Sequence, residues 1–306
     1  MKTKSGLALI WISVLIFSSF ACKFIVPDSS ETLPIGEIIY QTNQDGNFEL
    51  YSIDIRSGAT FRLTNNSAND MSPTFIAAKN QIGFISDRQN GLHLYVMDTL
   101  GENIKSIISE KGTVVEYPDW STDGEFITAS LVEECLAPAK KCVYDIYVMN
   151  ADGTNLKNLT NTPESEWVPA WSPDGEQLAF SSDRDGDREI YVMNRDGSHL
   201  VQLTKNSGYD GRPRWSIDGT RLAFETDRDG GDWDIFTMNT DGTDPNPITN
   251  NFSNDISESW SPDGNWLVYV SNSDGDSEIF IIDSNGQNQR QLTNNSSNDI
   301  APIWIP

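Results

Sequence analysis

Carboxylates recur at one fixed position in the chain, five residues before a regularly spaced aromatic residue. The recurring carboxylates are Asp70, Glu166, Asp210, Asp255 and Asp299, and Val115 followed by Glu116 takes the sixth such position. Carboxylates that lie close together raise one another's pKa or recruit a cation. A ring of them could bind a cationic peptide segment, a Lys or Arg of a partner, or Ca²⁺. The alternative is that each carboxylate accepts backbone N–H bonds inside its own loop.

Two tryptophans, Trp167 and Trp233, are expected beside these carboxylates. They could stack on a sugar or anchor a peptide, and the alternative is that they pack between structural units. The acidic segments 183–189, 227–232 and 274–276 suggest calcium, but glycine follows the second acid rather than the third, unlike an EF-hand loop. We interpret these segments as hairpin turns. We predict no cofactor, and Ca²⁺ is the alternative that the carboxylates leave open.

Residues suited to catalysis are few. The two histidines, His93 and His199, are far apart in the chain and have no Cys or His neighbour at metal-binding spacing. The sequence contains neither a Gly-x-Ser-x-Gly elbow nor a glycine-rich phosphate loop before a helix. We therefore predict that the protein is not an enzyme. A glycosidase that uses only carboxylates is the alternative that this reasoning leaves open.

The charge of the chain excludes two classes of partner. The 306 residues carry 21 Lys and Arg against 45 Asp and Glu, a formal charge of −24. Without residues 1–21, which carry Lys2 and Lys4 and no acid, the charge is −26. Such a surface repels nucleic acid and anionic membranes. Hydrophobic residues make up 37% of the chain, with nine Trp, so we expect a folded core rather than disorder.

The first residues are typical of an export signal, because Lys2 and Lys4 precede an apolar run that ends in small residues before Cys22. This segment resembles the lipobox of bacterial lipoproteins, although Ser19 stands where that motif usually has Leu. The resemblance implies a signal over 1–21, a lipidated Cys22, a linker over 22–34 and a location on the outer face of a bacterial membrane or in the periplasm. An ordinary signal cut near Ala21 is the alternative.

The two remaining cysteines, Cys135 and Cys142, flank a short loop. An exported chain favours paired thiols, so we predict a disulfide between them. Closing so short a loop stabilises the fold by about 2–3 kcal/mol at most. Two free buried thiols are the alternative.

A repeat of about 45 residues organises the rest of the chain. The anchors Phe75, Trp120, Trp171, Trp215, Trp260 and Trp304 are 45, 51, 44, 45 and 44 residues apart, and a proline lies two residues before each except Trp260. Most anchors are followed by a Ser-Pro-Asp-Gly type of turn, two β-rich runs, a second turn that ends in Gly and a short run that ends in Leu-Thr or Ile-Thr. We expect the anchor tryptophans to be core residues.

Four short strands repeated at this period are typical of propeller blades. The first repeat, near Ile35, lacks its opening strand, and the last anchor begins a strand that no further blade follows. We therefore predict an all-β, six-bladed propeller over 35–306, in which the C-terminal strand completes the first blade and closes the ring. Closure leaves no exposed sheet edge.

The repeat resembles the TolB-type, WD-like propellers of bacterial envelope proteins. Segments 171–175 (WSPDG), 182–186 (SDRDG) and 190–194 (IYVMN) carry the resemblance, which covers residues 35–306. It implies an envelope protein that binds a protein or peptide, although the α/β domain that precedes the propeller in TolB is not expected here. We predict a monomeric, non-catalytic propeller that binds its partner through an acidic loop face. A carbohydrate-binding or carbohydrate-active propeller and a purely structural module are the alternatives.

Overall fold

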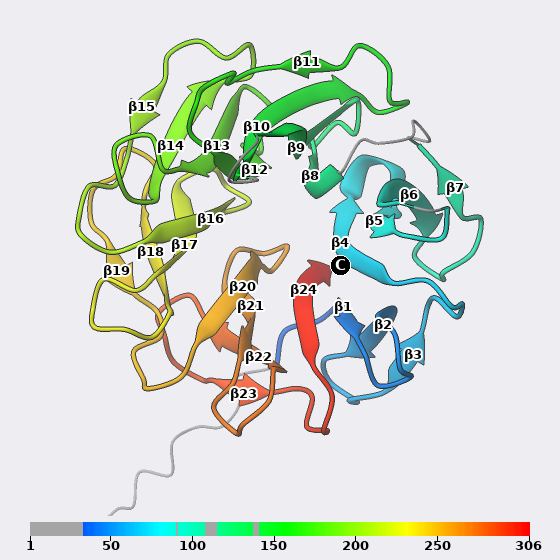
Figure 1. Ribbon diagram of the computed structural model, residues 1–306. Coiled ribbons are helices and arrows are strands. Elements are labelled where there is room, and N and C mark those ends of the chain that lie inside the picture. Colours follow the sequence, from blue (N-terminus) through cyan, green and yellow to red (C-terminus); the bar gives the residue numbers. More distant parts are fainter. Residues whose placement is uncertain (1–32, 90, 108–114, 137–140) are drawn as a thin grey trace, which may run out of the picture. The chain divides into compact units, whose positions relative to one another are not determined.

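The computed structural model describes residues 33–89, 91–107, 115–136 and 141–306. Within these residues the chain from Pro34 forms a ring of six four-stranded antiparallel sheets around a central channel (Figure 1). This confirms the predicted all-β, six-bladed propeller. The predicted signal and the lipidated Cys22 lie outside the described residues.

We number the blades 1 to 6 along the chain and give the strands of each from the channel outward. Blade 1 consists of β24 (Asp299–Ile305), β1 (Glu37–Thr42), β2 (Glu49–Asp54) and β3 (Thr60–Arg62). Blade 2 consists of β4 (Asp70–Ile76), β5 (Gln81–Ser86), β6 (His93–Asp98) and β7 (Lys105–Ser106), with the short 3₁₀ helix η1 (Ala77–Lys79) after β4. Blade 3 consists of β8 (Val115–Trp120), β9 (Phe126–Leu136), β10 (Lys141–Asn150) and β11 (Lys157–Asn158).

The second half of the ring repeats this order. Blade 4 consists of β12 (Glu166–Trp171), β13 (Gln177–Ser182), β14 (Glu189–Asn194) and β15 (Val201–Gln202). Blade 5 consists of β16 (Asp210–Trp215), β17 (Arg221–Thr226), β18 (Asp234–Asn239) and β19 (Asn246–Pro247). Blade 6 consists of β20 (Asp255–Trp260), β21 (Trp266–Ser271), β22 (Glu278–Asp283) and β23 (Arg290–Gln291).

The turns predicted from the repeat form as hydrogen-bonded units. In blade 4, the Asp174 carboxylate accepts hydrogen bonds from the Ser172 hydroxyl at 2.6 Å and from the Glu176 N–H at 3.1 Å. Gly175 has a φ of 72°, in the left-handed region that glycine enters without strain. The backbone reversal therefore depends on the local residues Ser-x-Asp-Gly and needs no contact from another blade.

The ring closes where the sequence analysis placed the closure. The C-terminal strand β24 pairs antiparallel with β1, with Trp304 opposite Ile38 and Ile305 opposite Glu37. In Figure 1 the two ends of the ring, β24 and β1, lie side by side. This confirms that the last strand completes the first blade.

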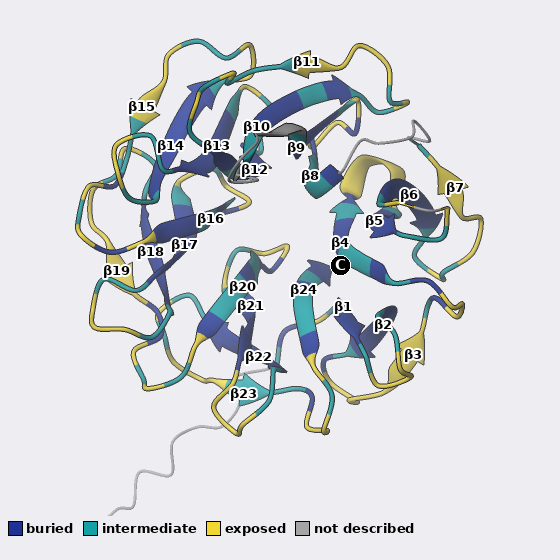
Figure 2. Cartoon of the chain, viewed as in Figure 1, coloured by how far each residue is buried: buried dark blue, intermediate teal, exposed yellow. Residues whose placement is uncertain are grey.

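Most of the apolar core lies between adjacent blades, and one small cluster lies inside blade 3. One cluster packs Ala223 and Ile235 of blade 5 against Tyr269 and Phe280 of blade 6. Another joins blade 6 to blade 1 and includes Trp304. The second and third strands of the blades are largely buried in Figure 2, the innermost strands alternate between buried and half-buried residues, and exposed residues concentrate in the turns and outer strands. The predicted core tryptophans Trp120, Trp171, Trp260 and Trp304 are buried, and Trp215 is half-buried.

Two further observations concern the cysteines and the membrane. Cys142 is disulfide-bonded, and Cys135 lies opposite it in the β9–β10 register, as the sequence prediction requires.

In the described part of the chain, no helix is both long enough and apolar enough to cross a membrane.

Replacing Trp304 tests the importance of ring closure for stability. Trp304→Ala should lower the free energy of unfolding by about 3–5 kcal/mol, because this buried ring joins the last strand to blades 6 and 1. Chemical denaturation followed by fluorescence or circular dichroism measures the change. Ile217→Ala, at a side chain that is 54% exposed, is the matched control and should change the free energy by less than about 0.5 kcal/mol. Equal effects of the two substitutions would contradict the role of Trp304.

Candidate functional site

The five predicted carboxylates lie at the starts of innermost strands but do not form an exposed ring. Asp70, Glu166, Asp210, Asp255 and Asp299 are each 0% exposed. Asn206, four residues before Asp210, donates to its Oδ2 at 2.7 Å, and asparagines in the same position bond Asp70, Asp255 and Asp299. These buried side chains therefore hold the loops between blades, and their binding of a partner or a cation stays a prediction.

Arginines from the hairpins compensate three of these buried charges. Arg88 pairs with Asp70 at 2.8 Å, Arg184 with Glu166 at 3.0 Å and Arg228 with Asp210 at 2.7 Å. Each arginine belongs to the hairpin between the second and third strands of the same blade. A buried carboxylate needs such a partner because water no longer solvates it.

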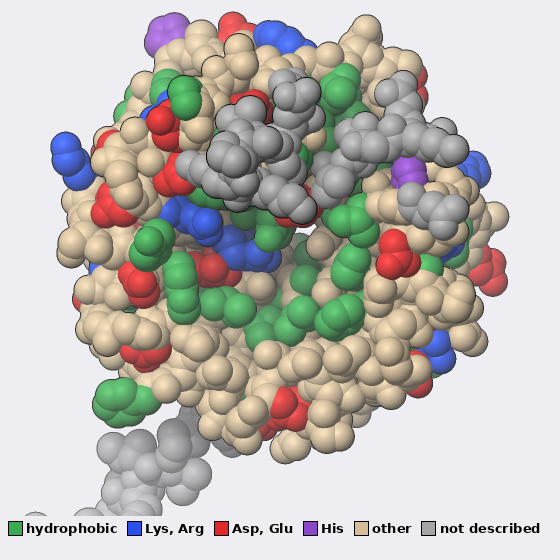
Figure 3. Space-filling model, viewed as in Figure 1, with side chains coloured by type: hydrophobic (Ala, Val, Ile, Leu, Met, Phe, Trp, Pro, Cys, Tyr) green, Lys and Arg blue, Asp and Glu red, His purple; other side chains and the backbone are tan. Residues whose placement is uncertain are grey.

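A different set of charges lies at the channel. The Arg188 guanidinium stacks over the Trp167 ring at 4.1 Å, and Arg212 lies 5.5 Å from the centre of the Tyr117 ring. Arg212 also pairs with Glu225 at 3.0 Å. In Figure 3, Lys and Arg side chains lie together with hydrophobic ones beside the central hollow. We call Arg188, Arg212, Trp167 and Tyr117 the arginine–aromatic mouth.

Bulges in the innermost strands aim side chains into the channel. The third residue of every innermost strand has a positive φ, between 50° and 59°, and the register shifts there; these residues are Ser72, Tyr117, Val168, Arg212, Ser257 and Ala301. A bulge re-orients the following side chains and leaves a backbone N–H unpaired by the ladder. Side chains of neighbouring blades accept hydrogen bonds from some of these N–H groups. Gln41 Oε1 accepts from Ser72 at 2.6 Å, and Glu225 Oε1 accepts from Ser257 at 2.5 Å.

A cavity of about 270 Å³ lies in the channel, and its lining includes Tyr117 and Arg212 of the mouth. Its lining includes Asp119, Arg212, Arg214, Ser257 and Glu258. Glu258 is 3% exposed, and neither of its carboxyl oxygens has a hydrogen-bond partner. The cavity therefore combines buried groups of both charges, with one carboxyl group whose hydrogen-bonding capacity is unused.

The electrostatics of this cavity favour the neutral form of Glu258. Burial, and then the nearby charge of Glu225, raise the pKa of Glu258 to about 8. Burial also raises the pKa of Asp119, while Arg214 opposes that shift. Both effects favour the neutral carboxylic acid form of Glu258 over the carboxylate.

Sequence reasoning missed Glu258, although a signal was present. In every other repeat the same position, two residues before the anchor aromatic, is proline. Glu258 interrupts the repeat, and a residue that departs from a structural repeat is free to serve a local purpose. Arg212 and Glu225 likewise occupy positions where the repeats differ from one another.

The predicted aromatic residues occupy different environments. Trp167 is half-buried, and one ring face carries Arg188, which limits its use as a platform for sugars. Trp233 is half-buried in its hairpin, where its backbone N–H donates to Asn254 Oδ1 at 3.1 Å. On the inter-blade loops, Tyr209 is 51% exposed and Phe252 is fully exposed.

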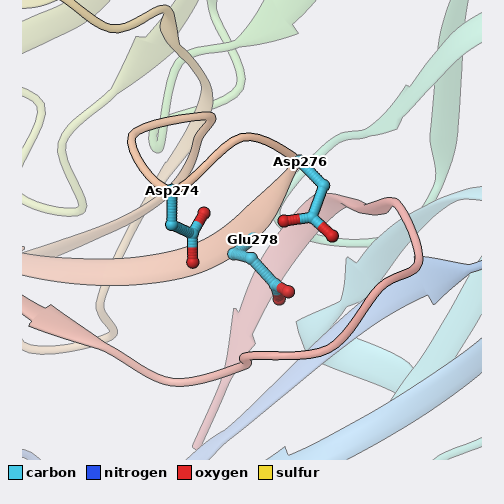
Figure 4. A group of neighbouring side chains, drawn as sticks. All are labelled: Asp274, Asp276 and Glu278. Atoms are coloured by element: carbon cyan, nitrogen blue, oxygen red, sulfur yellow. The ribbon is translucent and has the colours of Figure 1, made fainter.

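One acidic group has a geometry that could hold a metal ion. Asp274, Asp276 and Glu278 each offer a carboxylate oxygen, and these atoms all lie within 4.8 Å of one another (Figure 4). The site belongs to one of the segments that we interpreted as ordinary hairpin turns.

Comparisons with known proteins relate the chain to one family. The family model of the TolB beta propeller domain matches residues 33–135 and 139–255. The Protein TolB homolog of Chlorobium luteolum is 27% identical over 149 residues, which are 49% of this chain and 32% of that protein. The chain thus spans about a third of the length of this curated relative.

Solved structures share the fold at low sequence identity. The crystal structure of TolB from Acinetobacter baumannii superimposes with a TM-score of 0.77 at 22% identity, over 88% of this chain and 66% of that one. An oligogalacturonate lyase from Vibrio parahaemolyticus superimposes with a TM-score of 0.61 at 13% identity, over 85% of this chain and 75% of that one. Propellers of this architecture therefore occur in proteins of different function.

A pH titration of stability tests the protonated Glu258. Its pKa in the folded state lies above its value in the unfolded chain, so its contribution to stability is present at low pH and is lost as the pH rises through about 8. Glu258→Gln should therefore stabilise the protein at pH 9 relative to the parent chain, by about 2–4 kcal/mol. Denaturation at pH 5, 7 and 9 measures this difference.

Asp174→Asn in an exposed turn is the control, because the hydrogen bonds of Ser172 and Glu176 lower the pKa of Asp174. If the free energies of unfolding of the parent chain and of the Glu258→Gln variant changed in parallel with pH, the raised pKa of Glu258 would be contradicted.

Proposed function

The chain belongs to the TolB beta propeller domain family, and from this membership we propose that it is a non-catalytic cell-envelope protein whose propeller binds a protein or peptide partner. The observation that carries the proposal is the arginine–aromatic mouth, which lies among exposed loop residues. Its groups are large, partly desolvated and rich in hydrogen-bond donors, as in protein-binding hot spots.

The proposed binding surface is the loop face, defined as the face that carries the inter-blade loops and the hairpins between second and third strands. Both sets of loops lie on one face because the first and third strands of a blade run in the same direction. Arg188 lies in such a hairpin, and its side chain packs 3.5 Å from the position that a Cβ on Gly211 would take. Tyr209 and Phe252 lie on inter-blade loops of the same face and add exposed apolar surface.

The acidic character predicted for this face resides at the hairpin tips. Asp45, Asp185, Asp229 and Asp274 are exposed and occupy equivalent tip positions in four blades. The loop face thus has a negative outer rim and arginines at its centre. A partner that fits this pattern carries basic residues around an acidic or hydrogen-bond-accepting tip, and the tip would enter the mouth.

The arrangement of the aromatics argues against the carbohydrate alternative. A sugar platform needs an open ring face, whereas Arg188 covers one face of Trp167. The half-buried guanidinium groups of Arg188 and Arg212 suit a carboxylate or a main-chain carbonyl better than a neutral sugar.

Binding measurements with paired arginine variants test the proposal. Partners are captured from an envelope fraction by cross-linking to the purified chain, identified by mass spectrometry and then titrated by calorimetry. Arg188→Glu should weaken partner binding about tenfold or more, because it places a negative charge where the acidic or hydrogen-bond-accepting tip of the partner would bind.

The matched control is Arg195→Glu, since Arg195 also stacks on an aromatic ring, 5.2 Å from the centre of Phe126, but lies in a turn of the opposite face. This variant should bind as the parent chain does. Equal losses in both variants, or no loss in either, would overturn the assignment to the loop face.

We also propose that the protein is exported and held at the outer side of a bacterial membrane by a lipid on Cys22. The support is the basic and apolar segment before Cys22 and its resemblance to a lipobox. Mass spectrometry of the purified N-terminus should find a lipidated cysteine, and Cys22→Ala should move the protein from the membrane fraction to the soluble fraction. An unmodified Cys22 in a membrane-bound protein would contradict this.

A further inference from the structure

Three charged residues that the repeat does not copy line the channel cavity. Glu258 takes the place of a proline that every other innermost strand carries two residues before its anchor. Asp119 and Arg214 directly precede their anchors, and the other four blades have uncharged residues at that position. All three line the cavity of about 270 Å³. Blade packing does not require these charges, because the other blades form without them.

The Glu258 carboxyl group is buried without a partner. It is 3% exposed, and in the described ranges neither of its oxygens has a hydrogen-bond partner. The charged groups that face it are Glu225, Arg212 and Arg214. Arg212 pairs with Glu225 at 3.0 Å and not with Glu258. A buried carboxyl group in this state has lost water and gained nothing in return, so it is suited to a ligand that supplies a donor.

Arg214 is a half-buried cation that lacks a paired carboxylate. Its Nη1 donates to the Pro213 carbonyl at 3.2 Å, and among the residues that the structure describes it forms no ion pair. Burial lowers the pKa of Arg214, and the charges of Asp119 and Glu258 oppose this shift. Asp119 instead accepts a hydrogen bond from the Trp171 N–H at 2.8 Å. Opposite charges therefore line one cavity without touching each other.

An apolar groove of about 210 Å³ adjoins this cavity on the face opposite the loop face, where Ile217 lies in a Ser-x-Asp-Gly turn. Arg214, Phe75, Ile217 and Trp304 line both the cavity and the groove. Ile217 is 54% exposed, so the groove opens to solvent. A polar group at Arg214 consequently has apolar surface beside it. Small-molecule sites typically combine such an apolar lining with a few well-placed polar groups.

We propose that the cavity and the groove bind a small zwitterion with an apolar body, namely an α-amino acid with an aromatic or branched aliphatic side chain. Arg214 donates two parallel N–H groups to the α-carboxylate. Glu258 and Asp119 accept hydrogen bonds from the α-ammonium group, and the side chain of the amino acid packs against Ile217 in the groove.

A zwitterion fits this site better than a simple anion or cation. A carboxylate alone leaves Glu258 without a donor, and an amine alone leaves the guanidinium of Arg214 without an acceptor. The inference goes beyond the proposed partner binding, which uses Arg188 on the other face. Amino acid binding is measured without the partner, so its failure leaves the partner-binding proposal standing.

Calorimetry with L-phenylalanine and the purified full chain tests the site. We expect one ligand per chain, and the melting temperature should rise by about 5 °C when the free amino acid exceeds Kd about 100-fold. Three analogues divide the ligand into its parts. 3-Phenylpropanoate lacks the ammonium group, 2-phenylethylamine lacks the carboxylate and glycine lacks the apolar body. Each analogue should bind about tenfold or more weakly than L-phenylalanine.

Two outcomes of these titrations would overturn the proposal. If either phenyl analogue bound as tightly as L-phenylalanine, the site would not be one for a zwitterion. If neither L-phenylalanine nor L-leucine gave heat or a melting shift at millimolar concentration, the site would not take an apolar amino acid.

Variants of the two unpartnered groups locate the ligand. Glu258→Pro restores the residue of the other repeats, so the variant should fold and should bind L-phenylalanine about tenfold or more weakly. Arg214→Gln should weaken L-phenylalanine to a similar extent but leave the weak binding of 2-phenylethylamine unchanged. The matched control is Arg195→Gln, in a turn of the same face as the groove, which should leave the affinity unchanged. Unchanged affinity in both Glu258→Pro and Arg214→Gln would overturn the proposal by placing the ligand elsewhere.

Proton release gives a readout that a merely structural Glu258 would not change. Burial and the charge of Glu225 raise the pKa of Glu258 to about 8, so an ammonium group that binds beside it at pH 7 should displace its proton. Calorimetry in phosphate and in Tris, which differ in ionisation enthalpy, should detect this release in the parent chain and not in Glu258→Pro. Binding without proton release in the parent chain would overturn the contact between the ammonium group and Glu258.

Discussion

Each blade buries most of its apolar surface against its two neighbours, and the rest of the structure depends on this constraint. The clusters that join Tyr269 of blade 6 to Ile235 of blade 5, and Trp304 to blade 6, belong to no single blade. A row of such blades leaves one apolar face open at each end, and a ring leaves none. Closure through β24 and β1 is therefore the contact on which the burial of all six blades relies.

The same constraint explains why the carboxylates are buried. Successive blades pack tightly only if the loops between them are held. Five of these loops are held by a carboxylate at the start of an innermost strand, namely Asp70, Glu166, Asp210, Asp255 and Asp299. Burial brings a desolvation cost that the fold offsets with the hairpin arginines Arg88, Arg184 and Arg228. Charge compensation is thus part of blade packing wherever these hairpin arginines occur.

Residues that depart from the repeat mark the places where this propeller differs from a uniform ring. Glu258 replaces a recurring proline and is left with two unused carboxyl oxygens beside the channel cavity. Arg212 occupies a bulge position that other blades fill with uncharged residues, and Arg188 extends from a hairpin over Trp167. A repeat copies whatever the fold needs into every blade, so a site specific to one ligand has to arise from such exceptions.

The sequence by itself determined the fold, because its information is local and repeated. Turn residues such as Asp174 and Gly175 act within a few positions, and the missing first strand and surplus last strand specify the closure. Only the tertiary structure decided what the carboxylates do. Asp210 looks the same in the sequence whether it faces solvent or Arg228, since that contact joins residues 18 positions apart through two strands. The channel charges arise between blades, where spacing along the chain carries no direct information about distance.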